Sequence, residues 1–226
     1  MKKIQIFRSL LQLSYITLLF TSFFIDFKSF LLVILISTVL GGAFFCGWLC
    51  PFGTLQEILG NISDLFNIKK IKISNNIHKY LRYMRYIILI LALNGLIFLY
   101  RFDARISFLD ILNGSTIAII AYLSVGFFVL LSLFVDRPFC NYFCPQGAQY
   151  GLFSSLRLFR IKRNKDLCIN CKICDSKCPM NIKISEGDDV KSLQCINCFE
   201  CIANCPKKGA LKYGFSDFRN LFKFKN

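Results

Sequence analysis

The stretch Cys168–Pro179, CINCKICDSKCP, spaces its four cysteines as C-x2-C-x2-C-x3-C-P, and Cys195–Pro206, CINCFECIANCP, repeats that spacing. This is the ligand spacing of bacterial [4Fe–4S] clusters, in which the fourth cysteine of each run binds the other cluster. The repeat therefore predicts two [4Fe–4S] clusters. The predicted ligands of cluster 1 are Cys168, Cys171, Cys174 and Cys205, and those of cluster 2 are Cys195, Cys198, Cys201 and Cys178.

Two zinc sites of four thiolates each are the alternative for these eight cysteines. Structural zinc sites usually combine pairs of C-x2-C, however, and not triplets with a trailing Cys-Pro. The internal repeat favours a small α+β, ferredoxin-like domain over residues 161–212, followed by a tail at 213–226. Because such a domain has a small apolar core, we expect the clusters to contribute much of its folding free energy.

The residues before this domain are unusually apolar. The chain has 226 residues, of which 55% are hydrophobic, and its mean hydropathy is +0.51. A membrane-spanning helix needs about 20 apolar residues. Four runs lack any charged residue, namely 9–25, 29–49, 86–100 and 111–135. The predicted fold class is therefore mainly α, with a four-helix transmembrane domain of two tandem hairpins over residues 1–160 and the ferredoxin-like domain after it.

The basic residues are distributed unevenly around these runs. If all four runs span a membrane, 25 of the 28 lysines and arginines lie on one side, which is the cytoplasmic side. The sequence thus predicts a multi-pass inner-membrane protein in contact with lipid, with both termini and the ferredoxin-like domain in the cytoplasm. The net charge of +15 is explained by this asymmetry, and no other feature favours nucleic acid as a partner. In the reducing cytoplasm, the 12 cysteines favour metal binding over disulfides.

A second cysteine pattern, C-x3-C-P-x-G, occurs twice. CGWLCPFG starts at Cys46 and CNYFCPQG starts at Cys140. In a continuous helix the two cysteines of each frame share one face, and Pro and Gly are expected to end that helix. If both frames lie at the same depth, Cys46, Cys50, Cys140 and Cys144 form one site for a third Fe–S centre or another thiolate-bound metal. The alternative is that these cysteines only pack helix ends.

His78 is the only histidine in the chain. Membrane b-type haems usually take two histidine ligands, so no haem is expected. His78 lies in HKYLRYMRY, for which a solvated helix face is the main expectation and a proton acceptor at a quinone site the minor one.

Taken together, the two C-x3-C-P-x-G frames, the four apolar runs and the tandem cysteine runs resemble the NapH/NosR/CcoG family of polytopic membrane ferredoxins. The layout is closest to a NapH-like quinol dehydrogenase membrane component. Members of this family are associated with electron transfer between the quinone pool and respiratory reductases or their maturation, and one branch with copper reduction. The resemblance implies the same class of activity here, with a redox protein as a partner.

Three functions are thus predicted, in order of preference. The first is electron transfer between the quinone pool, or another donor, and a redox partner through the two clusters, as a component of an oxidoreductase. The second is metal handling or maturation, such as copper reduction, by the thiols of the C-x3-C-P-x-G frames. The third is a sensor of oxygen or iron, which ranks last because the sequence contains no output domain.

Overall fold

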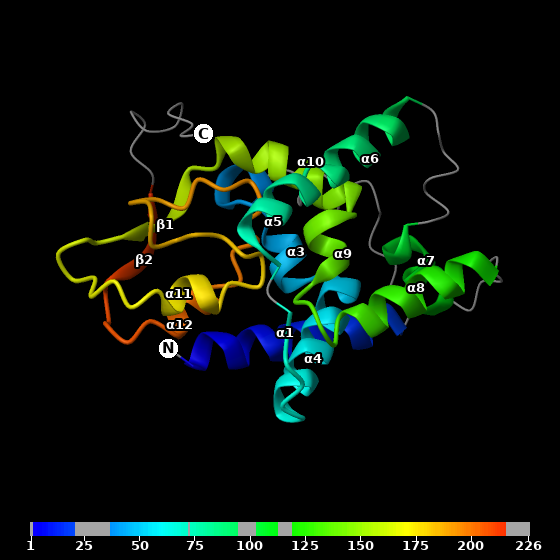
Figure 1. Cartoon of the computed structure of the whole chain (residues 1–226), viewed down its shortest axis with the longest axis horizontal. Helices are drawn as coiled ribbons and strands as arrows, with labels where there is room; N and C mark the ends of the chain where they lie inside the picture. Colours follow the sequence, from blue (N-terminus) through cyan, green and yellow to red (C-terminus); the bar gives the residue numbers. More distant parts are fainter. Residues whose placement is uncertain (1, 21–36, 72, 95–102, 113–118, 216–226) are drawn as a thin grey trace. The chain divides into compact units, whose positions relative to one another are not determined.

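A computed structural model describes residues 2–20, 37–71, 73–94, 103–112 and 119–215 (Figure 1). These residues are mainly helical, with one small two-stranded sheet. The helices are α1 (Lys2–Phe20), α3 (Phe44–Trp48), α4 (Pro51–Leu65), α5 (Asn75–Leu81), α6 (Met84–Leu93), α7 (Ala104–Leu112), α8 (Ile119–Leu131), α9 (Pro138–Tyr142), α10 (Pro145–Phe153), η2 (Ser154–Leu156), α11 (Ile173–Ser176) and α12 (Glu200–Ala203). The strands are β1 (Phe159–Arg163) and β2 (Leu211–Phe215).

The chain divides into two compact units. Unit 1 comprises Met1–Tyr15, Phe23–Leu49 and Tyr150–Asn226, and unit 2 comprises Ile16–Ser22 and Cys50–Gln149. Both cysteine runs therefore belong to unit 1, together with the first half of α1 and all of α3. The domain boundaries drawn from the sequence, 1–160, 161–212 and 213–226, stay predictions, and the tail after residue 215 lies outside the described residues.

The described helices contradict the predicted transmembrane domain. None of them has both the length and the apolar character needed to cross a bilayer. α1 has 19 residues but starts with Lys2 and Lys3 and includes Arg8. α6 has 10 residues and α8 has 13, which at 1.5 Å per residue gives at most about 20 Å, against the roughly 30 Å of a hydrocarbon core. This finding overturns the four-helix transmembrane fold class and the multi-pass membrane localisation that was derived from it.

The spans were predicted on the assumption that each run without charged residues forms one unbroken helix. In the second run, residue 42 leaves the helical conformation and α3 starts only at Phe44. In the third, the helix ends at Leu93 with Asn94 as its cap. The backbone thus divides these runs at places where composition gives no sign of a break.

In unit 1 the sheet closes the segment that carries the cysteines. β1 and β2 are antiparallel, with Phe159 opposite Phe215 and Arg163 opposite Leu211. The two cysteine runs, with their short helices α11 and α12, lie in the chain between these strands (Figure 1). A small core joins the sheet to the runs, with Ile161, Ile184, Val190, Cys195, Cys201 and Leu211 as its buried members. Two of the predicted ligands are therefore part of the core itself.

In unit 2 the packing centres on aromatic rings and two ion-paired groups. Phe139 packs edge to face against Phe52 and Phe128, with ring centroids 5.3 and 5.0 Å apart. Arg137 is buried and pairs with Glu57. Lys70 lies 2.8 Å from Asp136, and it also pairs with Asp64. These contacts connect α4 to the segment between α8 and α9.

Candidate iron–sulfur centres

The two cysteine runs have the same backbone conformation. The second cysteine of each run lies between two residues of left-handed conformation, which are Asn170 and Lys172 in the first run and Asn197 and Phe199 in the second, with φ between 50° and 60°. A left-handed conformation costs a non-glycine residue about 1 kcal/mol or more. Alternation of left- and right-handed residues also turns successive backbone N–H groups inward, as occurs around Fe–S clusters. The local backbone therefore suits the group that the spacing predicts.

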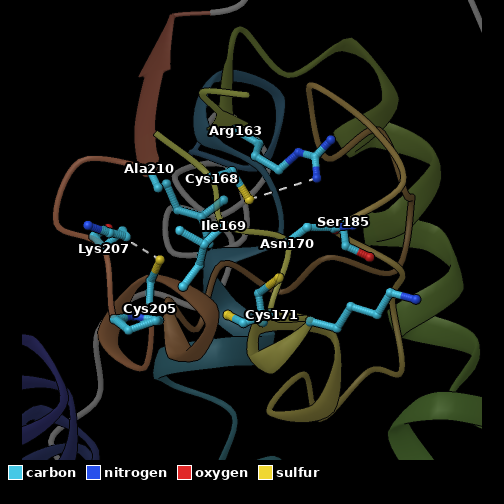
Figure 2. A pocket seen from close by; sticks show the side chains of 13 residues that line it. Arg163, Cys168, Ile169, Asn170, Cys171, Ser185, Cys205, Lys207 and Ala210 are labelled. Carbon is cyan, nitrogen blue, oxygen red and sulfur yellow. Dashed lines mark hydrogen bonds between the residues drawn. The ribbon is translucent and has the colours of Figure 1, made fainter. Parts of the chain in front are cut away.

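The predicted ligands of cluster 1 line one cavity. Cys168, Cys171 and Cys205 face it (Figure 2), and Cys174 lines it as well. Counted out into the open solvent at its mouth, the empty space is about 390 Å³. Arg163 lies 3.9 Å from the Cys168 sulfur. Cys205 donates to the Lys207 carbonyl at 3.3 Å, and Cys171 is exposed. A soft, four-sulfur donor set around one cavity fits a [4Fe–4S] cluster, although Cys205 lies more than 30 positions after Cys174 in the sequence.

The predicted ligands of cluster 2 lie together in the interior. Cys195, Cys198 and Cys201 are 5–8% exposed. Burial, and then the neighbouring thiols Cys198 and Cys195, raises the pKa of both Cys178 and Cys201. The thiols that contribute to these two shifts are close neighbours of Cys178 and Cys201, and iron would favour the deprotonated form of the cysteines when the cluster is bound. This donor set also fits the cluster predicted for it.

In the described part of the chain, no three His, Cys, Asp or Glu side chains are placed to hold a single metal ion. A cube-shaped cluster does not require such a point, because each of its four thiolates binds a different iron.

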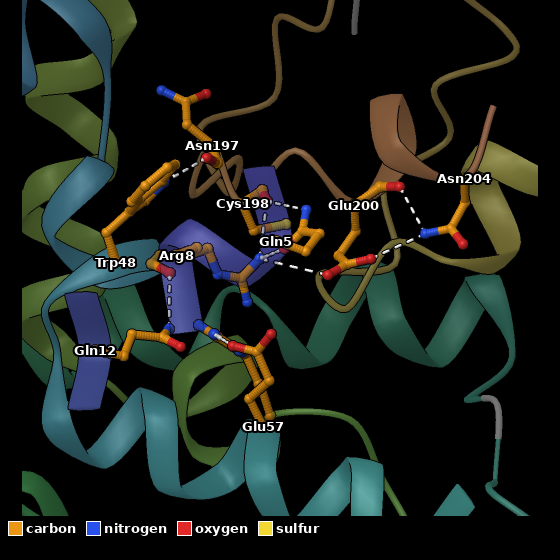
Figure 3. A network of polar contacts seen from close by, with 11 residues as sticks. Gln5, Arg8, Gln12, Trp48, Glu57, Asn197, Cys198, Glu200 and Asn204 are labelled. Atoms are coloured by element: carbon orange, nitrogen blue, oxygen red, sulfur yellow. Dashed lines mark hydrogen bonds and ion pairs between the residues drawn. The ribbon is translucent and has the colours of Figure 1, made fainter. Parts of the chain in front are cut away.

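The second cysteine run is held by residues from the start of the chain. The Arg8 guanidinium of α1 donates to the Cys198 carbonyl at 2.8 Å, and Gln5 donates to the same oxygen at 3.0 Å (Figure 3). Trp48 Nε1 donates to the Asn197 carbonyl at 2.9 Å. Asn197 in turn donates from Nδ2 to the Gly41 carbonyl at 2.5 Å. Four side-chain hydrogen bonds thus fix the backbone on both sides of one predicted ligand.

Gly47 allows this close contact. A Cβ at position 47 would lie 2.1 Å from the Ile196 carbonyl oxygen, closer than any real Cβ contact. Next to Gly47, Cys46 packs with Cys178 against a small cluster of Met180, Ile196 and Cys198. The first cysteine of the first C-x3-C-P-x-G frame therefore contacts the surroundings of cluster 2.

The two C-x3-C-P-x-G frames share a geometry that differs from the predicted one. The helix does end between the two cysteines, at Trp48 in α3 and at Tyr142 in α9. Pro51 and Pro145 do not terminate a helix but start the next one, α4 and α10. Proline suits the first helical position because its fixed φ is helical and its missing N–H has no partner there. Each frame is therefore a corner between two helices, and the predicted continuous helix is wrong.

Cys50 and Cys144 occupy equivalent places at these corners and are close together in unit 2. Both are 6% exposed. Burial raises the pKa of Cys144 to about 12, with further contributions from Asp103 and Cys50, and the Gly147 N–H donates to the Cys144 sulfur at 3.2 Å. Cys46 belongs to unit 1, whereas Cys50, Cys140 and Cys144 belong to unit 2. The site shared by all four cysteines stays a prediction.

His78 is not on a solvated helix face. It is 6% exposed, and its Nδ1 lies 2.9 Å from the Tyr142 hydroxyl. Desolvation, and then Arg82 and Arg85, lowers the pKa of His78, which favours the neutral ring. No local sequence pattern indicates the Tyr142 contact or the burial of Arg8, because both depend on residues that are distant along the chain.

Two family models match the chain. One, described as a 4Fe-4S binding domain, matches residues 28–70 and 117–165, and the other, described as a 4Fe-4S dicluster domain, matches residues 160–206. The first match includes all four cysteines of the C-x3-C-P-x-G frames, and the second includes all eight of the tandem runs. These matches confirm that the protein binds [4Fe–4S] clusters.

Several known proteins are similar to this chain in sequence. An uncharacterized protein of Methanocaldococcus jannaschii is 42% identical over 71% of this chain and 68% of its own length. The putative electron transport protein YccM of Escherichia coli is 31% identical over 71% of this chain and 48% of its own length. The ferredoxin-type protein NapH of Haemophilus influenzae is 29% identical over 66% and 51%. No solved structure matches the chain.

Proposed function

Because the chain belongs to the family of ferredoxin-type 4Fe–4S proteins that includes NapH and NosR, we propose that it passes electrons between a quinol and a redox partner protein. An iron–sulfur electron-transfer role is the general activity of this group. The finer assignment concerns the ligands, the donor and the route. Cluster 1 is assigned to Cys168, Cys171, Cys174 and Cys205, and cluster 2 to Cys195, Cys198, Cys201 and Cys178.

One observation carries the ligand assignment. The interleaved spacing predicts that Cys205 joins the first three cysteines and Cys178 joins the last three, and each of these distant residues lies among its predicted set. When bound, a [4Fe–4S] cluster supplies reversible one-electron transfer. The protein's own residues hold the sulfurs, bury those of cluster 2 and leave Cys171 of cluster 1 open to solvent. The exposed Cys171 would make cluster 1 the point of exchange with the partner, and the buried cluster 2 would connect cluster 1 to the rest of the protein.

Cys46 extends this route toward the C-x3-C-P-x-G frames. It packs, together with Cys178, against the buried cluster that includes Cys198. Two proposed ligands of cluster 2 therefore lie close to the first C-x3-C-P-x-G frame. We assign Cys46, Cys50, Cys140 and Cys144 to a third thiolate-bound centre, through which the quinol is oxidised. The family model that covers these four cysteines is itself a 4Fe-4S binding domain, which favours iron and sulfide over copper at that centre.

The test of the ligand assignment is a metal and sulfide count on the full chain purified without oxygen. Two clusters require about eight iron and eight sulfide per chain, and a third [4Fe–4S] centre raises both to about twelve. Cys171→Ser should remove the EPR signal of cluster 1, and Cys198→Ser that of cluster 2. Ser176→Ala, in α11 and not a ligand, is the matched control. Stoichiometric zinc without sulfide would contradict the proposal, and stoichiometric copper would favour the metal-handling function.

The quinol link has its own test. Duroquinol, a soluble quinol, should reduce the clusters of the wild-type protein. A Cys46→Ser, Cys140→Ser double variant should keep both EPR signals on chemical reduction but lose reduction by the quinol. Equal quinol rates in the two proteins would reject the third centre and leave the two-cluster assignment in place.

A further inference from the structure

The surface around cluster 1 combines exposed apolar side chains with positive charge. Leu167, Ile169 and Ile173 are 47%, 58% and 37% exposed. Leu167 and Ile169 flank Cys168 in the sequence, and Ile173 precedes Cys174. Ile169 lines the cavity itself. We call the surface formed by Leu167, Ile169, Cys171, Lys172, Ile173 and Lys207 the cluster 1 face. Its apolar residues are large side chains that the fold leaves open to solvent.

The charges on this face have one sign. Arg163 and Lys207 line the cavity (Figure 2), and so does Lys172. Among the residues that the structure describes, no acidic side chain lines it. Lys172 and Lys207 are exposed, and so is the adjacent Lys208. Lys165 is paired with Asp188 at 2.8 Å, so this pair adds no net charge. Over residues 159–215 there are 11 basic and six acidic residues, a net charge of +5. The acidic residue next to a cavity cysteine is Asp175, whose Oδ1 lies 3.7 Å from the Cys174 sulfur.

The cluster 2 run has no comparable surface. Its three leading cysteines are buried, and its second cysteine is enclosed by hydrogen bonds from α1 and by Trp48. Electron transfer slows steeply with distance, so a partner protein exchanges electrons fastest where a cluster ligand reaches the surface. In unit 1, Cys171 is that exposed ligand.

From this arrangement we propose that the cluster 1 face is the docking surface for an acidic one-electron carrier protein. The proposal rests on the proposed electron-transfer function and names the chemistry of its partner. Small, transient redox interfaces bury less than about 1,200 Å² of surface. The cluster 1 face, with three exposed apolar side chains and lysines beside them, suits an interface of that size. The opposite charges steer the encounter and raise the association rate. One electron passes between cluster 1 and the carrier, so that one is oxidised as the other is reduced, and no bond is made or broken.

The test uses the full chain with its clusters and reduced flavodoxin, an acidic carrier, as the probe. A Lys172→Glu, Lys207→Glu double variant should lower the second-order rate of reduction roughly tenfold at low ionic strength, because reversing rim charges acts on association. The difference should nearly vanish at about 0.5 M salt, where charges are screened over a few ångströms. Lys3→Glu with Lys79→Glu makes the same change in net charge at exposed positions that do not line the cavity, and it should retain most of the rate.

Two further measurements separate the possible failures. Iron, sulfide and EPR must match between the variants, and photoreduced 5-deazariboflavin, an uncharged small reductant, should reduce all of them equally. Absence of clusters in the wild-type protein would refute the proposed function itself. With clusters present, equal flavodoxin rates in the two double variants, or a wild-type rate that does not depend on salt, would overturn the docking surface alone. Loss of binding to anionic phosphatidylglycerol vesicles without loss of the flavodoxin rate would assign the face to lipid instead, and would also overturn the proposal.

Discussion

Lys172 and Phe199 occupy the same position in the two cysteine runs, directly after the second cysteine, and both have left-handed backbone. Lys172 is exposed at the rim of an open cavity. Phe199 packs edge to face against Phe44, Trp48 and Tyr213, with ring centroids 5.2–6.0 Å apart. The same backbone conformation thus occurs both at an exposed site and at a buried one. The repeat sets where the sulfurs lie, and the residues between them set which cluster meets solvent.

The largest expected effect comes from removing the space that lets α3 approach the second run. Gly47→Ala places a Cβ within 2.1 Å of the Ile196 carbonyl, and backbone on both sides leaves little room to adjust. We expect the free energy of unfolding to fall by about 4 kcal/mol or more, which is exceptional for a single substitution. In an isolated helix the same change would stabilise by about 1 kcal/mol. Hydrogen exchange of the amides at 195–201 should rise sharply.

Gly214→Ala is the matched control for this change, because a Cβ at Gly214 meets nothing within 4 Å. It should leave exchange at 195–201 unaltered. Equal protection in the Gly47→Ala and Gly214→Ala proteins would mean that the second run does not depend on α3, and the contrast between the runs would fail.

The second largest effect on stability is expected from replacing Phe199, in contrast to Lys172 at the same position of the other run. Phe199→Ala removes a ring that contacts three others, and losses for buried phenylalanine are about 3–5 kcal/mol; for the half-buried Phe199 we expect about 3 kcal/mol. Lys172→Ala removes an exposed side chain and should change stability by less than about 0.5 kcal/mol. Urea unfolding of the cluster-loaded chain, followed at the two EPR signals separately, measures both. Similar losses for the two variants would show that the sites are energetically alike.

A smaller effect is expected at Arg8. Arg8→Met keeps the length of the side chain but removes the Arg8 donor to the Cys198 carbonyl, while the Gln5 donor stays. Loss of a hydrogen bond to a charged donor costs about 1.5–3 kcal/mol. Loss of the nearby positive charge should also lower the reduction potential of cluster 2, whereas that of cluster 1 should not move. Redox titration followed by EPR gives both potentials, and an equal shift of the two would contradict a local role for Arg8.

The smallest effects concern the left-handed asparagines, where opposite signs are expected. Asn170→Gly relieves backbone strain at an exposed residue and should stabilise by roughly 0.5 kcal/mol. Asn197→Gly relieves the same strain but loses the bond to the Gly41 carbonyl, so we expect a net loss of about 1 kcal/mol. Thermal unfolding of both variants checks the signs. A gain in both would imply that the bond from Asn197 to Gly41 contributes nothing.

These contrasts also explain which parts of the molecule could be predicted. The ligand sets were predicted from spacing alone, because three of the sulfurs of each cluster stand at fixed intervals along a short loop. They stay a prediction, and the structure brings Cys168 and Cys205 to one cavity. The environment of each cluster depends on partners such as Arg8 and Trp48, which are 190 and 149 residues from their acceptors. No local pattern encodes such contacts. Only the pairing of Phe199 with Lys172 in the aligned repeats hinted that the two sites differ.

The helical segments were predicted less well, for a related reason. Pro51 was taken as the end of a helix, although proline is equally suited to start one, and the neighbouring residues do not decide between the two. Likewise, freedom from charge described the composition of the apolar runs and not the continuity of their helices, since Asn94 ends α6 inside such a run. Sequence pattern located the chemistry better than it located the breaks in the backbone.

The bond from Arg8 to the Cys198 carbonyl has a consequence for biosynthesis. The two residues are 190 positions apart, and ribosomes add about 5–20 residues per second, so Arg8 waits roughly 10–40 s for its acceptor to be made. With the proposed ligand sets, cluster 2 is complete only once Cys201 is translated, and cluster 1 only once Cys205 is translated. The N-terminal helix and the final cysteines must therefore come together after nearly the whole chain exists, and delivery of iron and sulfide belongs to the last stage of maturation. A ribosome that stalls upstream of residue 195 leaves a chain that cannot complete either cluster.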